Sequence, residues 1–272
     1  SWYIDDMKRK AYESDPIPSQ LTHDKYVAGN RDAIWYNDLK PNDTLDIKTW
    51  MNWIASDDIR TMEELQSGTM VHTYPTKLIR IPVDKNTVLS KGIVPQKDSD
   101  LIVPSIVVNI KEDVLYKNRL LMLDVIANNN WERPIYFTGG SFGDDDYLWM
   151  KDYLQLDGVC YKLVPIRTPI DPQSPYDMGR IDSEKFYNIV MNWYWGNSGD
   201  PDVYHDTETR RNGITYRGNL ARLTETLINE KQFIKAKEVG ELPPEIIAPS
   251  LKNPPRPAGG FGARVGKNKR DS

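Results

Sequence analysis

The sequence contains one cysteine and three histidines, and this scarcity excludes several kinds of site. Cys160 has no second cysteine to pair with, so an intramolecular disulfide and a multi-cysteine zinc site are both excluded. The histidines, His23, His72 and His205, lie far apart along the chain, which argues against a histidine-based triad or metal centre. Cys160 lies in an alternating, strand-like segment, where a small buried apolar side chain is expected.

Long apolar runs and a dominant charge are also missing. No run of about eighteen apolar residues occurs, so we expect no membrane-spanning helix within this chain. The formal net charge is -4, and this near balance gives no indication of a nucleic-acid partner. A glycine-rich phosphate loop, a nucleophile elbow and a zinc-binding histidine pair are absent, so the motifs predict no catalytic residue, metal or cofactor. Because the chain begins at Ser1 and not at methionine, we expect it to be a piece of a longer protein.

The best-organised part of the sequence is its middle, where extended and helical patterns alternate. The predicted elements there are a strand at 106–110, a helix at 117–129, a strand at 135–138, a helix at 146–156 and a strand at 159–166. This β-α-β-α-β order predicts a layered α/β fold with a largely parallel sheet and flanking helices. Upstream, we expect a helix at 48–55 and a strand at 76–83.

Changes in composition predict three regions along the chain. A proline-rich loop after Thr168 separates an α/β domain, residues 1–168, from a helical region, residues 169–239. The helices predicted in the second region are at 183–193 and 207–229. The following segment resembles the second half of a tetratricopeptide repeat, although one such hairpin cannot form a solenoid. Residues 240–272 hold many prolines and glycines without apolar periodicity, so they are predicted to be a disordered tail.

The loop after the predicted strand at 135–138 is a candidate ligand site. In open α/β sheets ligands usually bind beyond the carboxyl ends of strands, and this strand stops at a diglycine. Asp144, Asp145 and Asp146 follow within a few residues. Their carboxylates suit calcium, magnesium or the hydroxyls of a sugar, and the same residues would also serve as caps of the next helix.

Residues on the other side of this strand form a second part of the candidate site. Glu132 and Arg133 are expected either to frame a stacking platform made by Trp131, as in many carbohydrate sites, or to brace the fold as an ion pair. The predicted ligand-binding residues are therefore Trp131, Glu132, Arg133, Tyr136, Asp144, Asp145 and Asp146.

Several motifs follow one another along the sequence: WYIDDMKRK at 2–10, YESDPIP at 12–18, NWERPIYF at 130–137 and YLQLDG at 153–158. With the segment from Trp195 to Arg211, they resemble domain of unknown function 2723 of Bacteroidota. That family consists of large polytopic proteins similar to the transmembrane O-mannosyltransferases that modify plexins. The resemblance extends to about Val239, and the tail beyond it does not match the repeats expected there.

The resemblance implies that this chain is the soluble part of a lipid-sugar-dependent, glycosyltransferase-like membrane protein, at the periplasmic face of the inner membrane. The catalytic acidic residue would lie in the missing membrane-spanning region, so no catalytic residue is carried over. We therefore expect a non-catalytic module that binds or positions an acceptor protein or glycan, with the missing region as its partner. Two alternatives are an independent carbohydrate-active or metal-dependent hydrolase that uses the loop from Asp144 to Asp146 with Glu132, and a protein-interaction scaffold that uses the helical region.

Overall fold

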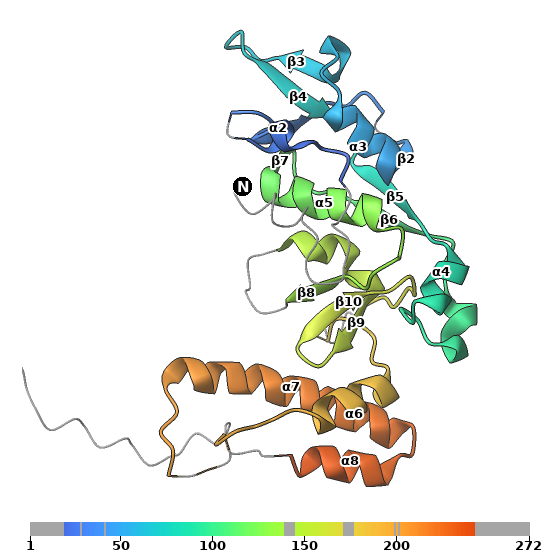
Figure 1. Cartoon of the computed structure of the whole chain (residues 1–272), viewed down its shortest axis with the longest axis vertical. Coiled ribbons are helices and arrows are strands. Elements are labelled where there is room, and N and C mark those ends of the chain that lie inside the picture. The colour runs from blue at the N-terminus through green and yellow to red at the C-terminus, as the bar shows by residue number, and fades with distance from the viewer. Residues whose placement is uncertain are drawn as a thin grey trace, which may run out of the picture.

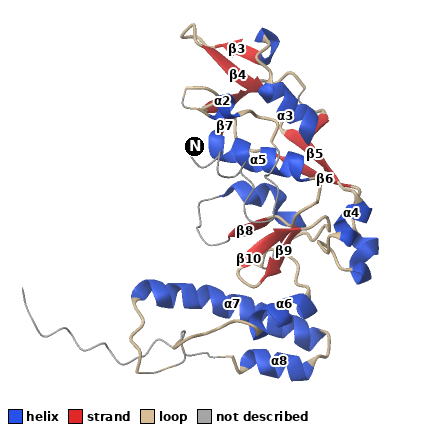
Figure 2. Ribbon diagram, viewed as in Figure 1, coloured by secondary structure: helices blue, strands red, loops and turns tan. Residues whose placement is uncertain are grey.

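The structure is a computed structural model of the chain. It describes residues 19–27, 29–40, 42–138, 145–170, 177–198, 200 and 202–242, with the backbone alone for residues 145–148. The described part is elongated: small sheets follow one another along the long axis, and a group of helices forms one end (Figure 1). Figure 2 shows the same arrangement, with the strands in the upper and middle parts and the helical end below.

The described strands form three sheets of three or four strands each. The strands are β1 (Ala33–Tyr36), β2 (Thr44–Asp46), β3 (Met62–Glu64), β4 (Met70–Tyr74), β5 (Leu78–Pro82), β6 (Ser105–Asn109), β7 (Val114–Tyr116), β8 (Tyr136–Thr138), β9 (Leu154–Asp157) and β10 (Cys160–Leu163). The strand orders are β3-β4-β1-β7, β2-β5-β6 and β8-β10-β9.

The helices lie between and beside these sheets. The α-helices are α2 (His23–Tyr26), α3 (Ile47–Ala55), α4 (Lys85–Ser90), α5 (Lys117–Asn129), α6 (Ser183–Met191), α7 (Thr207–Asn229) and α8 (Phe233–Gly240). The 3-10 helices are η1 (Ile59–Thr61), η2 (Gln96–Leu101) and η3 (Asp145–Tyr153). Helix α3 packs against α5 and against strands β4 and β5, so these two helices cover the sheets of the upper part.

The mixed α/β class is confirmed, but the prediction of a largely parallel sheet is wrong. Among the described strands, β1 with β4 and β2 with β5 are parallel, whereas five pairs are antiparallel. The predicted helix at 146–156 is the short helix η3 followed directly by β9. Gly158, at φ 71°, then allows a tight turn that folds β10 back onto β9. A glycine at the first position of a two-residue loop, here residues 158–159, is a hairpin signal, and the hairpin replaces the expected crossover.

The longest predicted helices are confirmed. Helix α5 occupies 117–129 and α7 occupies 207–229, with the bounds that the sequence predicts. Helix α5 ends at Asn130, which adopts the left-handed conformation at φ 47° that short amide side chains tolerate. Helices α7 and α8 form a helical hairpin, and its likeness to a tetratricopeptide repeat stays a prediction. From residue 243 on, the predicted tail lies outside the described residues.

Two clusters of buried apolar side chains hold the molecule together. The larger one lies between the sheets and helices α3 and α5, and Trp50, Tyr74 and Leu123 are among its fully buried members. The smaller one joins helices α6, α7 and α8. Its buried members are Leu156, Phe186, Val190, Leu223, Leu227, Ala236 and Val239. Leu156 belongs to β9, so this strand packs into the helical cluster.

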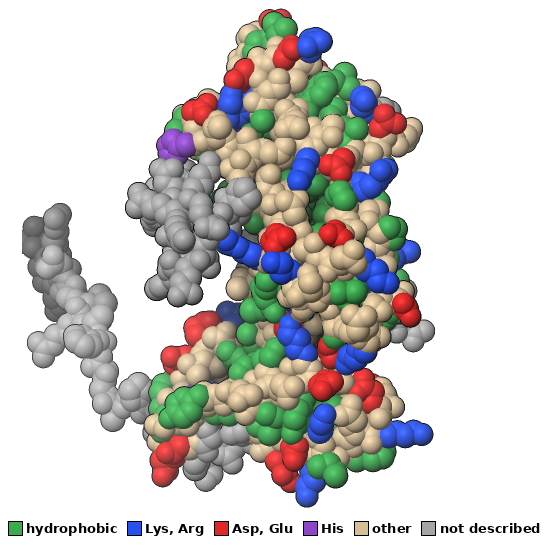
Figure 3. Space-filling model, turned by 45° about the vertical axis from the view of Figure 1, so that its right-hand side comes forward, with side chains coloured by type: hydrophobic (Ala, Val, Ile, Leu, Met, Phe, Trp, Pro, Cys, Tyr) green, Lys and Arg blue, Asp and Glu red, His purple; other side chains and the backbone are tan. Residues whose placement is uncertain are grey.

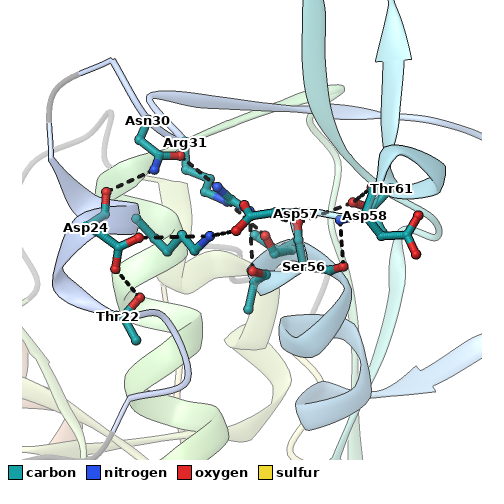
Figure 4. A network of polar contacts seen from close by, with 11 residues as sticks. Thr22, Asp24, Asn30, Arg31, Ser56, Asp57, Asp58 and Thr61 are labelled. Carbon is teal, nitrogen blue, oxygen red and sulfur yellow. Dashed lines mark hydrogen bonds and ion pairs between the residues drawn. The ribbon is translucent and has the colours of Figure 1, made fainter.

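A buried arginine fixes the end of helix α3 (Figure 4). The side chain of Arg31 is only 1% exposed, and its guanidinium donates to the carbonyls of Ile54 at 2.9 Å and Ser56 at 2.8 Å. It also pairs with Asp57 at 2.8 Å. Because the last carbonyls of a helix lack intrahelical partners, Arg31 supplies donors that the backbone cannot. Hydrogen bonds from Lys25 and Arg31 lower the pKa of Asp57 to about 2.

The surface carries charges of both signs. On the face shown in Figure 3, Lys and Arg side chains alternate with Asp and Glu, as the net charge of -4 would suggest. In the part of the chain that the structure describes, no helix combines the length and the apolar character needed to cross a membrane.

Candidate functional site

A cleft of about 410 Å³ lies where the C-terminal end of α6 faces the first turns of α7. We call it the aromatic cleft. Its lining residues are Val159, Trp193, Tyr194, Trp195, Ser198, Thr209, Asn212 and Tyr216. Three separate segments meet there: the tip of the β9–β10 hairpin, the loop that follows α6 and the N-terminal half of α7.

Helix α7 presents its part of the cleft through helical spacing. Thr209, Asn212, Tyr216 and Asn219 are three or four residues apart, so they share one face of the helix. The side-chain amide of Asn219 donates to the carbonyl of Gly158 at 2.9 Å, which ties this face to the hairpin tip. The helix begins where Asp206 caps its N-terminus by accepting from the backbone N–H of Thr209 at 2.7 Å.

The loop after α6 supplies the aromatic walls. The ring centroids of Trp193 and Trp195 are 5.4 Å apart, and that of Trp193 is 5.5 Å from Tyr216, both in edge-to-face arrangements. Trp195 and Tyr216 are 6.2 Å apart. Such edge-to-face contacts are favourable for aromatic rings and fix their mutual orientation. Tyr194, between the two tryptophans in sequence, is 96% exposed at the edge of the cleft.

The hairpin tip and the aromatic walls leave no room for a side chain between them. A Cβ at Gly158 would lie 3.0 Å from Cζ2 of Trp193 and 3.2 Å from Cγ2 of Ile189. A residue with a side chain is therefore disfavoured at position 158 for two reasons, the positive φ and the close approach of Trp193. The hairpin tip thus packs directly against the ring of Trp193.

Polar groups accompany the rings. The hydroxyl of Ser198 donates to the carbonyl of Trp195, and the Thr209 hydroxyl and Asn212 amide lie in the lining. The indole N–H of Trp195 is buried and finds no acceptor among the described residues. The cleft thus offers flat apolar faces with hydroxyl and amide groups.

The comparisons with known proteins concern the N-terminal part of the chain, which contributes only Val159 to the cleft lining. Residues 1–185 match the family described as TMEM260-associated domain 2. The chain belongs to this family. The family is related to transmembrane O-mannosyltransferase-like proteins, so the chain is a module associated with a membrane protein. No curated protein and no solved structure matches the chain. The assignments to domain 2723 and to Bacteroidota stay predictions.

The first three predicted site residues lie within this TMEM260-associated domain 2, away from the cleft. Trp131 is 7% exposed, and its indole N–H donates to the carbonyl of Pro82 at 2.7 Å. It lines a smaller pocket of about 280 Å³ together with both apolar and polar side chains. Glu132 pairs with Lys91 at 2.6 Å, and the backbone carbonyl of Arg133 accepts from Asn129. Their role in ligand binding stays a prediction.

The other predicted residues are distributed differently. The hydroxyl of Tyr136 donates to Asp157 at 3.1 Å and accepts from Nζ of Lys185 at 3.3 Å, within a cluster of charged side chains. Asp144 lies outside the described residues, and for Asp145 and Asp146 only the backbone, in η3, is described. Among the described residues no group of three His, Cys, Asp or Glu side chains is placed to hold a metal ion.

The sequence patterns did not predict the residues of the cleft, because Trp193 was assigned to the end of the predicted helix at 183–193, which in the structure ends at Met191. Two signals pointed to them. Trp193, Tyr194 and Trp195 are consecutive, and Gly196 follows at φ 57°, so the aromatic run falls where the helix has ended. Consecutive aromatics in a loop cannot all face one core, so part of this run has to meet solvent or a ligand.

Proposed function

We propose that this chain is a non-catalytic module of a membrane glycosyltransferase-like protein, and that it binds the glycan of an acceptor in the aromatic cleft. The observation that carries the proposal is the arrangement of Trp193, Trp195 and Tyr216 around a hollow with polar groups at its edge. Membership of TMEM260-associated domain 2 supports the association with a membrane protein.

The chemistry of the lining favours a sugar over a purely apolar ligand. The C–H face of a sugar ring stacks on an aromatic side chain, while its hydroxyls need donors and acceptors around it. Asn212 offers both a carbonyl and an N–H₂ group, and Thr209 offers a hydroxyl. Tyr194 belongs to the lining and is 96% exposed, so its ring is accessible to a bound sugar.

The proposed location is the periplasmic face of the inner membrane, and the proposed partner is the membrane-spanning region of the parent protein. Both follow from the family resemblance and from the relation to transmembrane O-mannosyltransferase-like proteins. In this arrangement the module holds an acceptor glycan or glycoprotein near the membrane, while the chemistry takes place in the parent's other part.

The proposal is tested by isothermal titration calorimetry with a panel of purified oligosaccharides. At least one glycan should bind, and Trp195→Ala and Tyr216→Ala should each weaken it about tenfold or more, as expected for the loss of about 1.4 kcal/mol of stacking. Tyr204→Ala is the matched control, because Tyr204 is 76% exposed and lies outside the cleft lining. Equal weakening by all three variants, or no binding across the panel, contradicts the proposal.

A second candidate, a protein-interaction scaffold, is favoured by apolar side chains at the turn between α7 and α8. Phe233 is 62% exposed and Ile234 78%, and Ile228 nearby is 48% exposed. Exposed apolar side chains of this size often mark contact surfaces. Under this proposal, Phe233→Ser with Ile234→Ser lowers co-purification with the separately expressed membrane-spanning region of the parent. Unchanged recovery excludes it, and glycan binding serves as the control.

A further inference from the structure

A second pocket, of about 710 Å³, lies between α6, β10 and the segment before η2. We call it the junction pocket, and its charged lining residues are Lys97, Lys162, Asp182, Glu184 and Lys185. It shares no lining residue with the aromatic cleft. An inference about the junction pocket is therefore independent of the proposed function.

Lys162 is the unusual residue of this pocket, because its side chain is only 1% exposed and lysines are rarely buried. Its Nζ atom donates to the carbonyl of Ile93 at 2.6 Å and lies 3.9 Å from Oδ2 of Asp157. Nζ of Lys185 lies 2.6 Å from the same Asp157 oxygen. The carboxylate is thus engaged mainly by Lys185. A buried amine without a carboxylate of its own is more stable when it is uncharged.

Charged and titratable groups from several elements face this amine. Asp157 is on β9, Lys185 and Asp182 belong to α6 and its N-cap, and Tyr136 on β8 contacts both Asp157 and Lys185. Burial, together with the hydrogen bond to Lys185, lowers the pKa of Lys162 to about 7. Partial burial by itself lowers the pKa of Lys185, but hydrogen bonds to Asp157 and Lys162 outweigh it and raise that pKa. The amine of Lys162 therefore loses its proton much more readily than the neighbouring ammonium group of Lys185.

We propose that Lys162 is a nucleophilic amine that binds a small aldehyde or ketone in the junction pocket as an imine. Lysines that are desolvated or placed next to another cation are those that form Schiff bases with carbonyl compounds. Both conditions hold here, since Lys162 is buried and its neighbour is the ammonium group of Lys185. Lys162 is among the residues that line the pocket, which has space for a small carbonyl compound.

The proposed step balances with the groups that are present. The lone pair of Lys162 Nζ forms a bond to the carbonyl carbon, and the carbonyl π electrons move to oxygen, which takes a proton from the Lys185 ammonium. The nitrogen then loses a proton to Lys185, which gives a neutral carbinolamine. Lys185 then protonates the hydroxyl group of the carbinolamine, and water leaves as the nitrogen lone pair forms the C=N bond. The remaining proton on the nitrogen passes to Lys185, which gives the neutral imine and restores the Lys185 ammonium group. No oxidant or reductant is needed, because amine and carbonyl give imine and water.

The test is reductive alkylation of the intact chain with propionaldehyde and sodium cyanoborohydride at pH 7, read out by peptide mass spectrometry. Lys162 should be alkylated at least about tenfold faster than Lys237, whose side chain is 76% exposed, because only a small fraction of an ordinary lysine is neutral at this pH. The Lys162 rate should also rise around pH 7, well below the rise for Lys237. A Lys162 rate equal to or below that of Lys237 overturns the proposal.

Variants of Lys185 show whether fast alkylation of Lys162 comes from the neighbouring cation or only from the accessibility of the amine. Lys185→Met removes the adjacent cation and should slow alkylation of Lys162 at pH 7 several-fold, whereas Lys185→Arg keeps the cation and should retain most of the rate. Circular dichroism checks that both variants are folded. If Lys185→Met accelerates the alkylation of Lys162, the rate is limited by access of the reagent to the amine, and the proposal is wrong. If Lys185→Met does not fold, the wild-type rate and its pH profile decide.

Discussion

Replacing Arg31 by methionine tests whether a buried guanidinium holds the end of helix α3. Methionine preserves most of the apolar stem and removes only the hydrogen-bonding group. The Ile54 carbonyl, at 2.9 Å, then loses its side-chain donor, whereas the Ser56 carbonyl, at 2.8 Å from Arg31, keeps the hydroxyl of Thr61 at 3.3 Å. Asp57 keeps its contact with Lys25 but loses the second cation.

The expected loss of stability follows from those contacts. A buried carbonyl left without a donor, here that of Ile54, costs about 1–2 kcal/mol, and the lost contacts to Ser56 and Asp57 add to it, so Arg31→Met should lower the free energy of unfolding by about 2–3 kcal/mol. For a chain of this size, a loss of about 3 kcal/mol corresponds to a fall in Tm of roughly 6–12 °C. Arg60 provides the matched control. It pairs with Asp58, the neighbour of Asp57, but its side chain is 84% exposed, so Arg60→Met should leave stability unchanged within error.

The assay is urea unfolding followed by tryptophan fluorescence, with Tm from differential scanning calorimetry as a second measurement. Added salt should not reduce the difference between wild type and Arg31→Met, because most of it comes from buried carbonyl bonds and not from a screened ion pair. If Arg31→Met and Arg60→Met unfold at the same urea concentration, the assignment of Arg31 as the cap of α3 is wrong.

Three other substitutions are informative. Asp124 is fully buried, and its carboxylate accepts from the backbone N–H groups of Gln20 and Leu21 and from the side chains of Tyr26 and Asn128. Asp124→Ala should therefore cost about 3 kcal/mol or more in urea unfolding, and a loss below about 1 kcal/mol would contradict this. Gly158→Ala should cost about 2–3 kcal/mol, because strain at positive φ adds to a clash with Trp193, whereas Gly92→Ala, with positive φ but open space, should cost about 1 kcal/mol; equal costs would remove the packing argument. Since the pKa of Lys162 falls from 10.5 to about 7 on folding, the unfolded chain binds more protons between these values, and stability should rise with pH across that window. Lys162→Met should remove this rise, so its cost relative to wild type should grow from pH 7 to pH 9.5, and a constant difference would show that the pKa is not lowered.

The parts of the fold that the sequence predicts best are those governed by local patterns. Helices α5 and α7 are long, and each has a recognisable end signal, Asn130 after the first and Asp206 before the second. The hairpin of β9 and β10 was missed, although Asp157-Gly158 is a local turn signal. The apolar residues Leu154 and Leu156 were assigned to the preceding helix, and that assignment masked the turn.

The candidate sites were harder to predict, because their residues come from distant segments. Asn219 reaches the carbonyl of Gly158 across 61 positions in sequence, and Lys162 reaches Ile93 across 69. Periodicity reports which face of an element is buried, but not which other segment covers it. A lysine within a strand pattern is normally assigned to solvent, so the burial of Lys162 had no sequence signal.

The insertion of Leu156 among the helices also bears on how the chain can be divided. The family match ends at residue 185, inside α6, whereas Phe186 and Val190, which surround Leu156, come just after it. A recombinant fragment that ends at residue 185 would expose the side chain of Leu156 to solvent, and this exposed apolar surface would promote self-association. Expression designs that aim at the family domain alone should therefore carry the three terminal helices along.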